Sequence, residues 1–142
     1  MGAGGWQWND AWIFVSAVIA ERLERDRALH AALPMAGASL ADVLAAADFL
    51  HHSIPSRGEL EESMRRLAGA GLLVVEDDLV EVAPAGEQLW RGRPFSGLSS
   101  AVMTMQTQLN RSTEPGDTDW TLDDQTYHAA VREYRHRLAD ER

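Results

Sequence analysis

The sequence contains no cysteine among its 142 residues. This absence excludes disulfide bonds, thiolate metal sites and cysteine nucleophiles, and it fits a reducing compartment. A long hydrophobic run is also missing, since the most apolar segment, residues 11–20, is too short to cross a bilayer. Asp10 precedes that segment where a signal peptide carries a basic residue, and no small-residue cleavage pattern follows it. We therefore expect a cytoplasmic protein with no membrane partner.

Positive charge is scarce. The chain has 13 Lys and Arg residues against 22 Asp and Glu, which gives a formal net charge of −9. A field of this sign repels polyanions at long range, so nucleic-acid binding would require a local basic patch. Residues 39–93 carry ten acidic side chains and five arginines. This segment therefore lacks the electrostatic footprint that is typical of nucleic-acid binders.

The sequence shows none of the common catalytic motifs. It contains no nucleophile elbow, phosphate loop, dinucleotide fingerprint or His-Glu-x-x-His. The five histidines include one adjacent pair, His51 and His52, but neighbours on a helix point about 100° apart and chelate a metal poorly. We therefore expect no catalytic, cofactor or metal site, and no enzyme.

Residues 39–89 organise the chain, because they predict a helix, a turn, a second helix, a hairpin and a short helix. Ser39 and Ser56 each stand three residues before an acid, Asp42 and Glu59, which is the pattern of a capping box. After the second of these helices, residues 72–75 and 79–82 predict two strands joined by the acidic turn 76–78. Pro84 then suits the first turn of a short closing helix, although Ala83 offers no capping oxygen.

Helical periodicity extends on both sides of this stretch. Trp12, Val15, Ile19 and Leu23 predict a first helix, capped by Asn9 or Asp10. Two further helices are predicted near the C-terminus, with apolar stripes of matching period on either side of a polar loop, and we expect them to form an antiparallel pair. Residues 1–8 then form a flexible N-terminus, residues 9–91 a core that includes the first helix, and residues 92–142 a linker and two helices for dimerisation or packing.

The third predicted helix, which begins after Ser56, exposes a mixed-charge face. Its outward residues include two pairs at the favourable i, i+4 spacing, Glu61 with Arg65 and Glu62 with Arg66. The glutamates would be repelled by the phosphates of a duplex. These spacings predict arginines that already have partners.

A family resemblance rests on the run Ala47-Asp48-Phe49-Leu50-His51-His52-Ser53-Ile54-Pro55-Ser56, on Glu59-Leu60, and on Leu67-Ala68-Gly69-Ala70-Gly71-Leu72. These residues resemble a family of mostly uncharacterised bacterial winged-helix-like proteins and, more loosely, regulators of the MarR and PadR types. The resemblance implies a winged helix-turn-helix core with N- and C-terminal flanking helices, so the expected class is mainly α with a small β-hairpin (α+β). In the looser relatives, helices outside the winged module pair two subunits.

Two functions follow as expectations. The first is a non-enzymatic winged-helix module for protein association, a homodimer with an acidic surface, and the alternative is a DNA-binding transcriptional regulator of MarR-like or PadR-like type. The candidate DNA or partner contacts are Arg57, Glu61, Glu62, Arg65, Arg66, Arg91 and Arg93. The candidate dimer interface comprises Trp6, Trp8, Leu98, Val102, Met105, Leu109, Tyr127, Val131, Tyr134 and Leu138.

Overall fold

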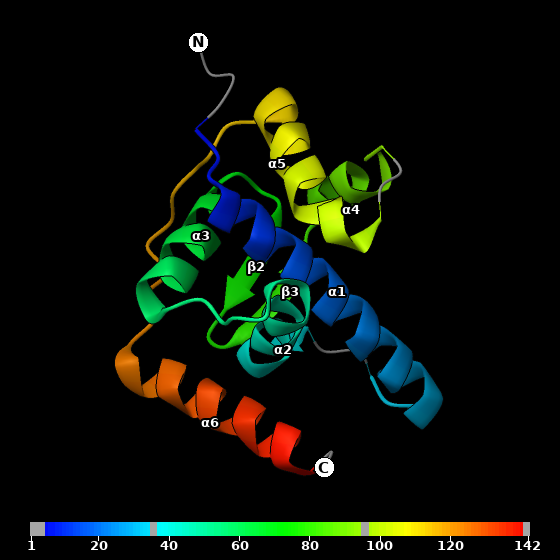
Figure 1. Cartoon of the computed structure of the whole chain (residues 1–142), viewed down its shortest axis with the longest axis vertical. Coiled ribbons are helices and arrows are strands. Elements are labelled where there is room, and N and C mark those ends of the chain that lie inside the picture. The colour runs from blue at the N-terminus through cyan, green and yellow to red at the C-terminus, as the bar shows by residue number, and fades with distance from the viewer. Residues whose placement is uncertain (1–4, 35–36, 95–96, 141–142) are drawn as a thin grey trace.

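The computed structural model describes residues 5–34, 37–94 and 97–140. Within these ranges it contains six α-helices, one short 3-10 helix and a small antiparallel sheet (Figure 1). The helices are α1 (Trp8–Ala31), α2 (Leu40–His51), α3 (Arg57–Gly69), α4 (Pro84–Arg91), α5 (Ala101–Ser112) and α6 (Asp124–Asp140). The strands are β1 (Ala38–Ser39), β2 (Leu73–Glu76) and β3 (Leu79–Val82), and the 3-10 helix is Leu98–Ser100. The expected class, mainly α with a small β element and flanking helices, is confirmed.

Helix α1 crosses the middle of the molecule and packs against α2, α3, α5 and strand β3. Every residue from Asp10 to Val18 is buried, which explains why its apolar residues are not confined to one stripe. Beyond Ala28 the helix is exposed, and its last turns project from the body (Figure 1). Among the described residues, no helix combines the length and the apolar character that a membrane span requires.

The two predicted capping boxes are present. The Ser39 hydroxyl accepts a hydrogen bond from the Asp42 amide at 3.1 Å, and the Asp42 carboxylate accepts one from the Ser39 amide at 2.9 Å. The box at Ser56 and Glu59 has the same two bonds, at 3.2 and 2.8 Å. The Ser56 amide, which bonds the carboxylate of Glu59, lowers the pKa of that group. The starts of α2 and α3 are therefore both fixed by reciprocal capping bonds, and the second box also closes the turn between the two helices.

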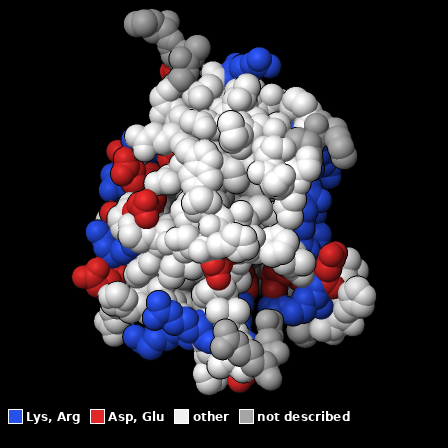
Figure 2. All heavy atoms as spheres, in the orientation of Figure 1, with Lys and Arg blue, Asp and Glu red and all other residues white. Residues whose placement is uncertain are grey.

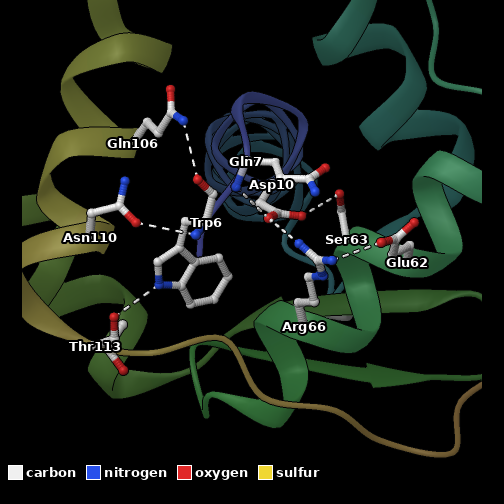
Figure 3. A network of polar contacts seen from close by, with 9 residues as sticks. All are labelled: Trp6, Gln7, Asp10, Glu62, Ser63, Arg66, Gln106, Asn110 and Thr113. Carbon is white, nitrogen blue, oxygen red and sulfur yellow. Dashed lines mark hydrogen bonds and ion pairs between the residues drawn. The ribbon is translucent and has the colours of Figure 1, made fainter. Parts of the chain in front are cut away.

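The start of α1 differs from the prediction. The helix begins at Trp8 with Gln7 as the cap, and Asp10 accepts from the Gln7 amide at 2.8 Å instead of capping the helix itself. Trp6 is 3% exposed, and its indole N–H donates to the carbonyl of Thr113 at 2.9 Å (Figure 3). Residues 6–8 therefore belong to the folded body and not to a flexible N-terminus, because the indole finds both an apolar pocket and an acceptor.

The sheet includes a strand that was not predicted. Strand β1, only two residues long, pairs antiparallel with β3 and places Ala38 opposite Val80. β3 in turn pairs with β2 in the predicted hairpin, so the strand order is β1-β3-β2. A strand of two residues is too short for alternation to be read, so the sequence gives no signal for it.

The predicted pairing of the two C-terminal helices is wrong. α5 packs on α1 and α4 at one side of the molecule, whereas α6 packs on α2 at the opposite side (Figure 1). The residue that caps the start of α6 is Asp123, whose carboxylate accepts from the Thr126 amide at 2.7 Å. Apolar periodicity identified the buried faces of both helices but could not identify the elements that cover them.

Candidate functional site

The outward face of α3 is covered by the chain itself. Residues 113–123, which we call the strap, connect α5 to α6 and run along α3 at the edge of the molecule (Figure 1, orange). Three residues of α3, spaced i, i+4 and i+8, bond to the strap: Arg57, Glu61 and Arg65. The face that was predicted to meet DNA or a partner is thus already in contact with a peptide segment.

Each of these three residues makes a different kind of bond. Arg57 donates to the carbonyl of Leu122 at 2.8 Å, and Glu61 accepts from the amide of Leu122 at 2.7 Å. Arg65 forms an ion pair with Asp117, with 2.9 Å between Nε and Oδ1. Arg57 also contacts the Asp124 carboxylate at 3.2 Å, at the start of α6. The strap is therefore held through both its backbone and its acidic side chains.

The expected i, i+4 ion pair between Glu61 and Arg65 is not among the ion pairs that these two residues form. Each residue instead has a partner on the strap, and Glu61 also contacts Arg57 at 3.4 Å. The other expected pair is confirmed, since Arg66 reaches the Glu62 carboxylate at 2.8 Å. The i, i+4 spacing made both pairs possible, and the strap offered better-placed partners to one of them.

Two glycines allow the strap to touch the backbone of α3. A Cβ atom on Gly116 would lie 2.2 Å from the carbonyl carbon of Gly69, and one on Gly69 would lie 2.0 Å from the amide nitrogen of Asp117. The Gly116 amide also donates to the carbonyl of Arg66 at 3.2 Å. No side chain fits at either position, so the contact is a close backbone approach that glycine alone permits.

The strap also reaches the turn of the β2–β3 hairpin. The indole N–H of Trp120 donates to the carbonyl of Asp77 at 3.2 Å, and Asp77 has the left-handed backbone angle φ of 52°. Asp and Asn tolerate this conformation better than most residues. The α3 face and the hairpin turn are thus joined by one segment, and both carry acidic groups.

Hydrogen bonds at the strap shift the pKa values of carboxylates on α3 and on the strap itself. The Leu122 amide, which bonds Glu61, lowers the pKa of that group. The Arg65 guanidinium lowers the pKa of Asp117, and the Thr126 amide lowers that of Asp123. In each case the bond favours the ionised form. The strap contacts are therefore strongest when these acids are charged.

Arg66 points away from the strap toward α1. It bonds to Asp10 at 3.2 Å as well as to Glu62, and the hydroxyl of Ser63 donates to Asp10 at 2.8 Å (Figure 3). Asp10 is 1% exposed, so α3 is anchored to α1 by a buried carboxylate with three donors, the third being the Gln7 amide. Figure 3 also shows Trp6 linking the same end of α1 to Gln106, Asn110 and Thr113 on the other side.

The remaining two candidate contacts lie elsewhere. Arg91 pairs with Glu87 at 3.1 Å, and the guanidinium of Arg93 stacks 3.6 Å from the ring centroid of Trp90. These residues are at α4, which lies across α1 from α3 (Figure 1). The structure therefore does not gather the seven candidate residues on one face.

Most of the candidate dimer residues lie inside the single chain. Seven are buried there: Trp6, Val102, Met105, Leu109, Tyr127, Val131 and Tyr134. Trp8 and Leu138 are half-buried against the same core, and Leu98 is 51% exposed. The phenol of Tyr127 donates to the carbonyl of Pro55 at 2.6 Å, and that of Tyr134 donates to Asp48. Burial raises the pKa of the Tyr127 phenol. These residues therefore hold the terminal helices to the core of their own chain.

No group of three or more His, Asp or Glu side chains in the described ranges is placed to hold a metal ion. Comparison of the chain with known protein families, with curated proteins and with solved structures found no match. The function must accordingly be argued from the surfaces of the molecule.

Proposed function

We propose that this chain is a cytoplasmic, non-enzymatic winged-helix module that works by protein association, as a homodimer. Three features of the fold support a winged helix. Helices α2 and α3 are joined by a capped turn, a β-hairpin follows α3, and β1 pairs with β3, the second strand of that hairpin. The module is used in nature both for DNA reading and for protein contacts, so the fold alone does not select between them.

The single observation that favours protein association is the strap across α3. A winged helix that reads DNA places the outward face of this helix in the major groove. Here Arg57, Glu61 and Arg65 on that face bond to the strap, and Asp117 lies on top of it. A duplex would have to displace the strap and its carboxylates before it met the helix.

Negative charge around the same face adds to this obstacle. The hairpin turn carries Glu76, Asp77 and Asp78, and Glu62 is 61% exposed beside the strap. Phosphates approaching α3 would meet these groups at short range, where salt screens them least. The acidic surface is better suited to a basic protein partner.

The alternative, a DNA-binding regulator of the MarR or PadR type, is favoured by one observation: Arg57 and Arg65 lie on the outward face of α3 and would be exposed if the strap moved away. Binding of the purified chain to random-sequence duplex DNA at low salt, followed by a salt titration, separates the two functions. We expect no binding by the wild type. Affinity that falls steeply with rising salt would overturn the proposal, because that slope reports phosphate contacts.

A strap variant sharpens this experiment. Gly116→Ala changes only the strap and leaves the surface of α3 intact, whereas Gly58→Ala, at a site with nothing within 4 Å, is a matched control. If the strap merely hides a DNA-binding face, Gly116→Ala binds DNA and Gly58→Ala does not. If α3 is not a DNA reader, neither variant binds.

A further inference from the structure

A groove with an apolar lining lies between the second half of α1, helix α2 and the C-terminal part of α6. Its volume is about 530 Å³. The apolar lining comes from Ile19, Ala20 and Leu23 of α1 and from Ala45, Ala46 and Phe49 of α2. Leu23 and Phe49 are 64% and 63% exposed, although both are large hydrophobic side chains. Exposed apolar surface that is gathered in one place, and not scattered, indicates an interaction site.

The end of α1 projects beyond the groove, whose lining reaches as far as Arg27 along this helix. This end carries two more exposed leucines, Leu29 at 73% and Leu33 at 64%, the second just past the helix. Beyond Arg25, the described side chains of α1 make polar contacts only within the helix itself, Arg27 with Glu24 and His30 with the carbonyl of Asp26. From Ile19 to Ala31 the helix is about 20 Å long, at about 1.5 Å per residue. The chain thus presents a groove and, beside it, a helix end with apolar side chains.

The charges around the groove are balanced. Glu24 and Arg27 lie on the α1 side, and Asp42 of α2 and Arg137 of α6 lie on the other. Asp42 and Arg137 form an ion pair at 2.6 Å. Burial acts to raise the pKa of Asp42, but the bonds from Arg137 and Ser39 outweigh it and lower the pKa. Figure 2 shows acidic and basic side chains adjacent to one another near the projecting end of α1.

The balance of charge around the groove affects which kind of partner can bind there. The chain carries a net charge of −9, so two copies repel each other over most of their surfaces. The groove has two acids and two arginines, and it gives a strongly basic or strongly acidic partner no electrostatic advantage. A second copy can supply the complementary charges, because two antiparallel α1 helices would present the Arg27 of each copy to the Glu24 of the other, and a two-fold interface must be complementary to itself.

We propose that a second copy of this chain covers the groove, with the projecting ends of the two α1 helices antiparallel across a two-fold axis. An axis between residues 24 and 27 places each Glu24 opposite Arg27 of the other copy, while Leu23 and Phe49 become buried. This inference rests on the homodimer in the proposed function and moves its interface away from the terminal aromatic and apolar residues that fill the core. It is independent of whether the chain binds DNA.

Sedimentation equilibrium of the full chain over a range of concentrations tests the inference. We expect a reversible dimer in the wild type. Leu23→Glu and Phe49→Glu should each raise the dissociation constant at least tenfold, because a charge in an apolar interface is costly. Met103→Glu is the matched control, since Met103 is 67% exposed on α5, away from the groove, and its variant should sediment like the wild type. Far-ultraviolet circular dichroism confirms that each variant is folded.

A charge exchange tests the antiparallel arrangement. Glu24→Arg alone and Arg27→Glu alone each place like charges opposite one another and should weaken the dimer, whereas the two changes together should restore it. A wild-type chain that stays monomeric overturns the proposal and assigns the groove to another occupant, a different protein or a small ligand. A dimer that Leu23→Glu and Phe49→Glu leave unchanged also overturns it. A monomeric wild type would also remove the homodimer from the proposed function, whereas a dimer that the two variants leave unchanged overturns this inference alone. Neither result bears on the DNA titration, which tests protein association against DNA binding separately.

Discussion

The outward face of α3 is polar but covered, whereas the groove beside α1 is apolar but exposed. This is the reverse of what is usual for surfaces of these two kinds. The α3 face is polar and charged, yet the strap covers it with hydrogen bonds, an ion pair and a backbone contact at Gly69 and Gly116. The groove exposes Leu23 and Phe49, yet no described residue of the chain buries them. Polar faces usually remain in water, and clustered apolar ones are usually covered.

The difference indicates that the α3 face forms a contact within the molecule and that the groove is available for a contact between molecules. Exposed ion pairs such as that of Arg65 and Asp117 contribute little each, so the strap depends on several weak bonds and on a close steric fit. The groove offers apolar area, which is the main source of free energy in association. We therefore treat the α3 face as an internal contact and the groove as an intermolecular one. Variants that weaken one region should accordingly leave the other intact.

The largest effect is expected from Asp10→Ala, which removes the anchor of α3 on α1. The buried carboxylate accepts from Ser63 and Arg66, and its loss leaves those donors without their acceptor. Removing one partner of a buried ion pair costs about 3–5 kcal/mol. Because Arg66 keeps its ion pair with Glu62, we expect the free energy of unfolding to fall by an amount at the low end of this range. Urea denaturation measures this change.

The matched control for Asp10→Ala is Glu62→Ala, which removes the other carboxylate of the same arginine. Glu62 is 61% exposed, so its loss should change the free energy of unfolding by no more than about 0.5 kcal/mol. Equal changes in the free energy of unfolding from the two variants would mean that the burial of Asp10 does not determine how much this residue stabilises the fold.

The next effect in size is expected from Gly116→Ala, which breaks the close contact of the strap with α3. The added Cβ would meet backbone and not a flexible side chain, so we expect a loss of about 1–3 kcal/mol together with faster proteolysis of residues 113–123. Gly58→Ala has nothing within 4 Å and should be neutral or slightly stabilising. If the strap remained resistant to protease in Gly116→Ala, the steric account of this contact would be wrong.

The structural features that depend on residues close together in the sequence were predicted, whereas the contacts between distant residues were not. The capping boxes at Ser39 and Ser56, the hairpin and the helix at Pro84 follow from short-range patterns, and all are present. The bond between Arg65 and Asp117 joins residues 52 positions apart, so no local spacing indicates it. The available signal was compositional, an acid-containing loop after α5 and a helix α3 with arginines, and it did not specify which acid meets which arginine.

Periodicity failed in a related way for the dimer interface. The stripes through Met105 and Val131 are real buried faces, but a stripe does not tell whether it packs within one chain or between two. Conversely, Leu23 was placed on the buried stripe of the first helix and is 64% exposed, because it lines the open groove between α1 and α2.

Acid should loosen the strap. The pKa values of Glu61, Asp117 and Asp123 are lowered in the folded chain from ordinary values of 4.5, 3.8 and 3.8. A lowered pKa means that the contribution to stability is complete above the ordinary value and is lost as the pH falls through the folded one. Hydrogen exchange at the Leu122 amide, compared between pH 6 and pH 3 after correction for intrinsic rates, should therefore show weaker protection in acid.

An arginine variant identifies the cause of one of these shifts. Arg65→Gln removes the guanidinium that bonds Asp117, so the pKa of Asp117 measured by NMR should rise toward its ordinary value, while that of Asp123, whose shift comes from the Thr126 amide, should not move. Unchanged titration of Asp117 would show that Arg65 does not hold the strap in solution.

The smallest effect on the isolated chain is expected from Phe49→Ala. With 63% of its surface exposed, Phe49 contributes little to the core, and the free energy of unfolding of the monomer should change by no more than about 0.5 kcal/mol. At concentrations above the dissociation constant the wild type should melt at a higher temperature, because dimerisation stabilises only the folded state, and Phe49→Ala should lose that increment. Thermal denaturation at two protein concentrations a hundredfold apart separates these contributions. A large loss at the lower concentration would make Phe49 part of the fold of the single chain, and the contrast between the covered α3 face and the exposed groove would then no longer hold.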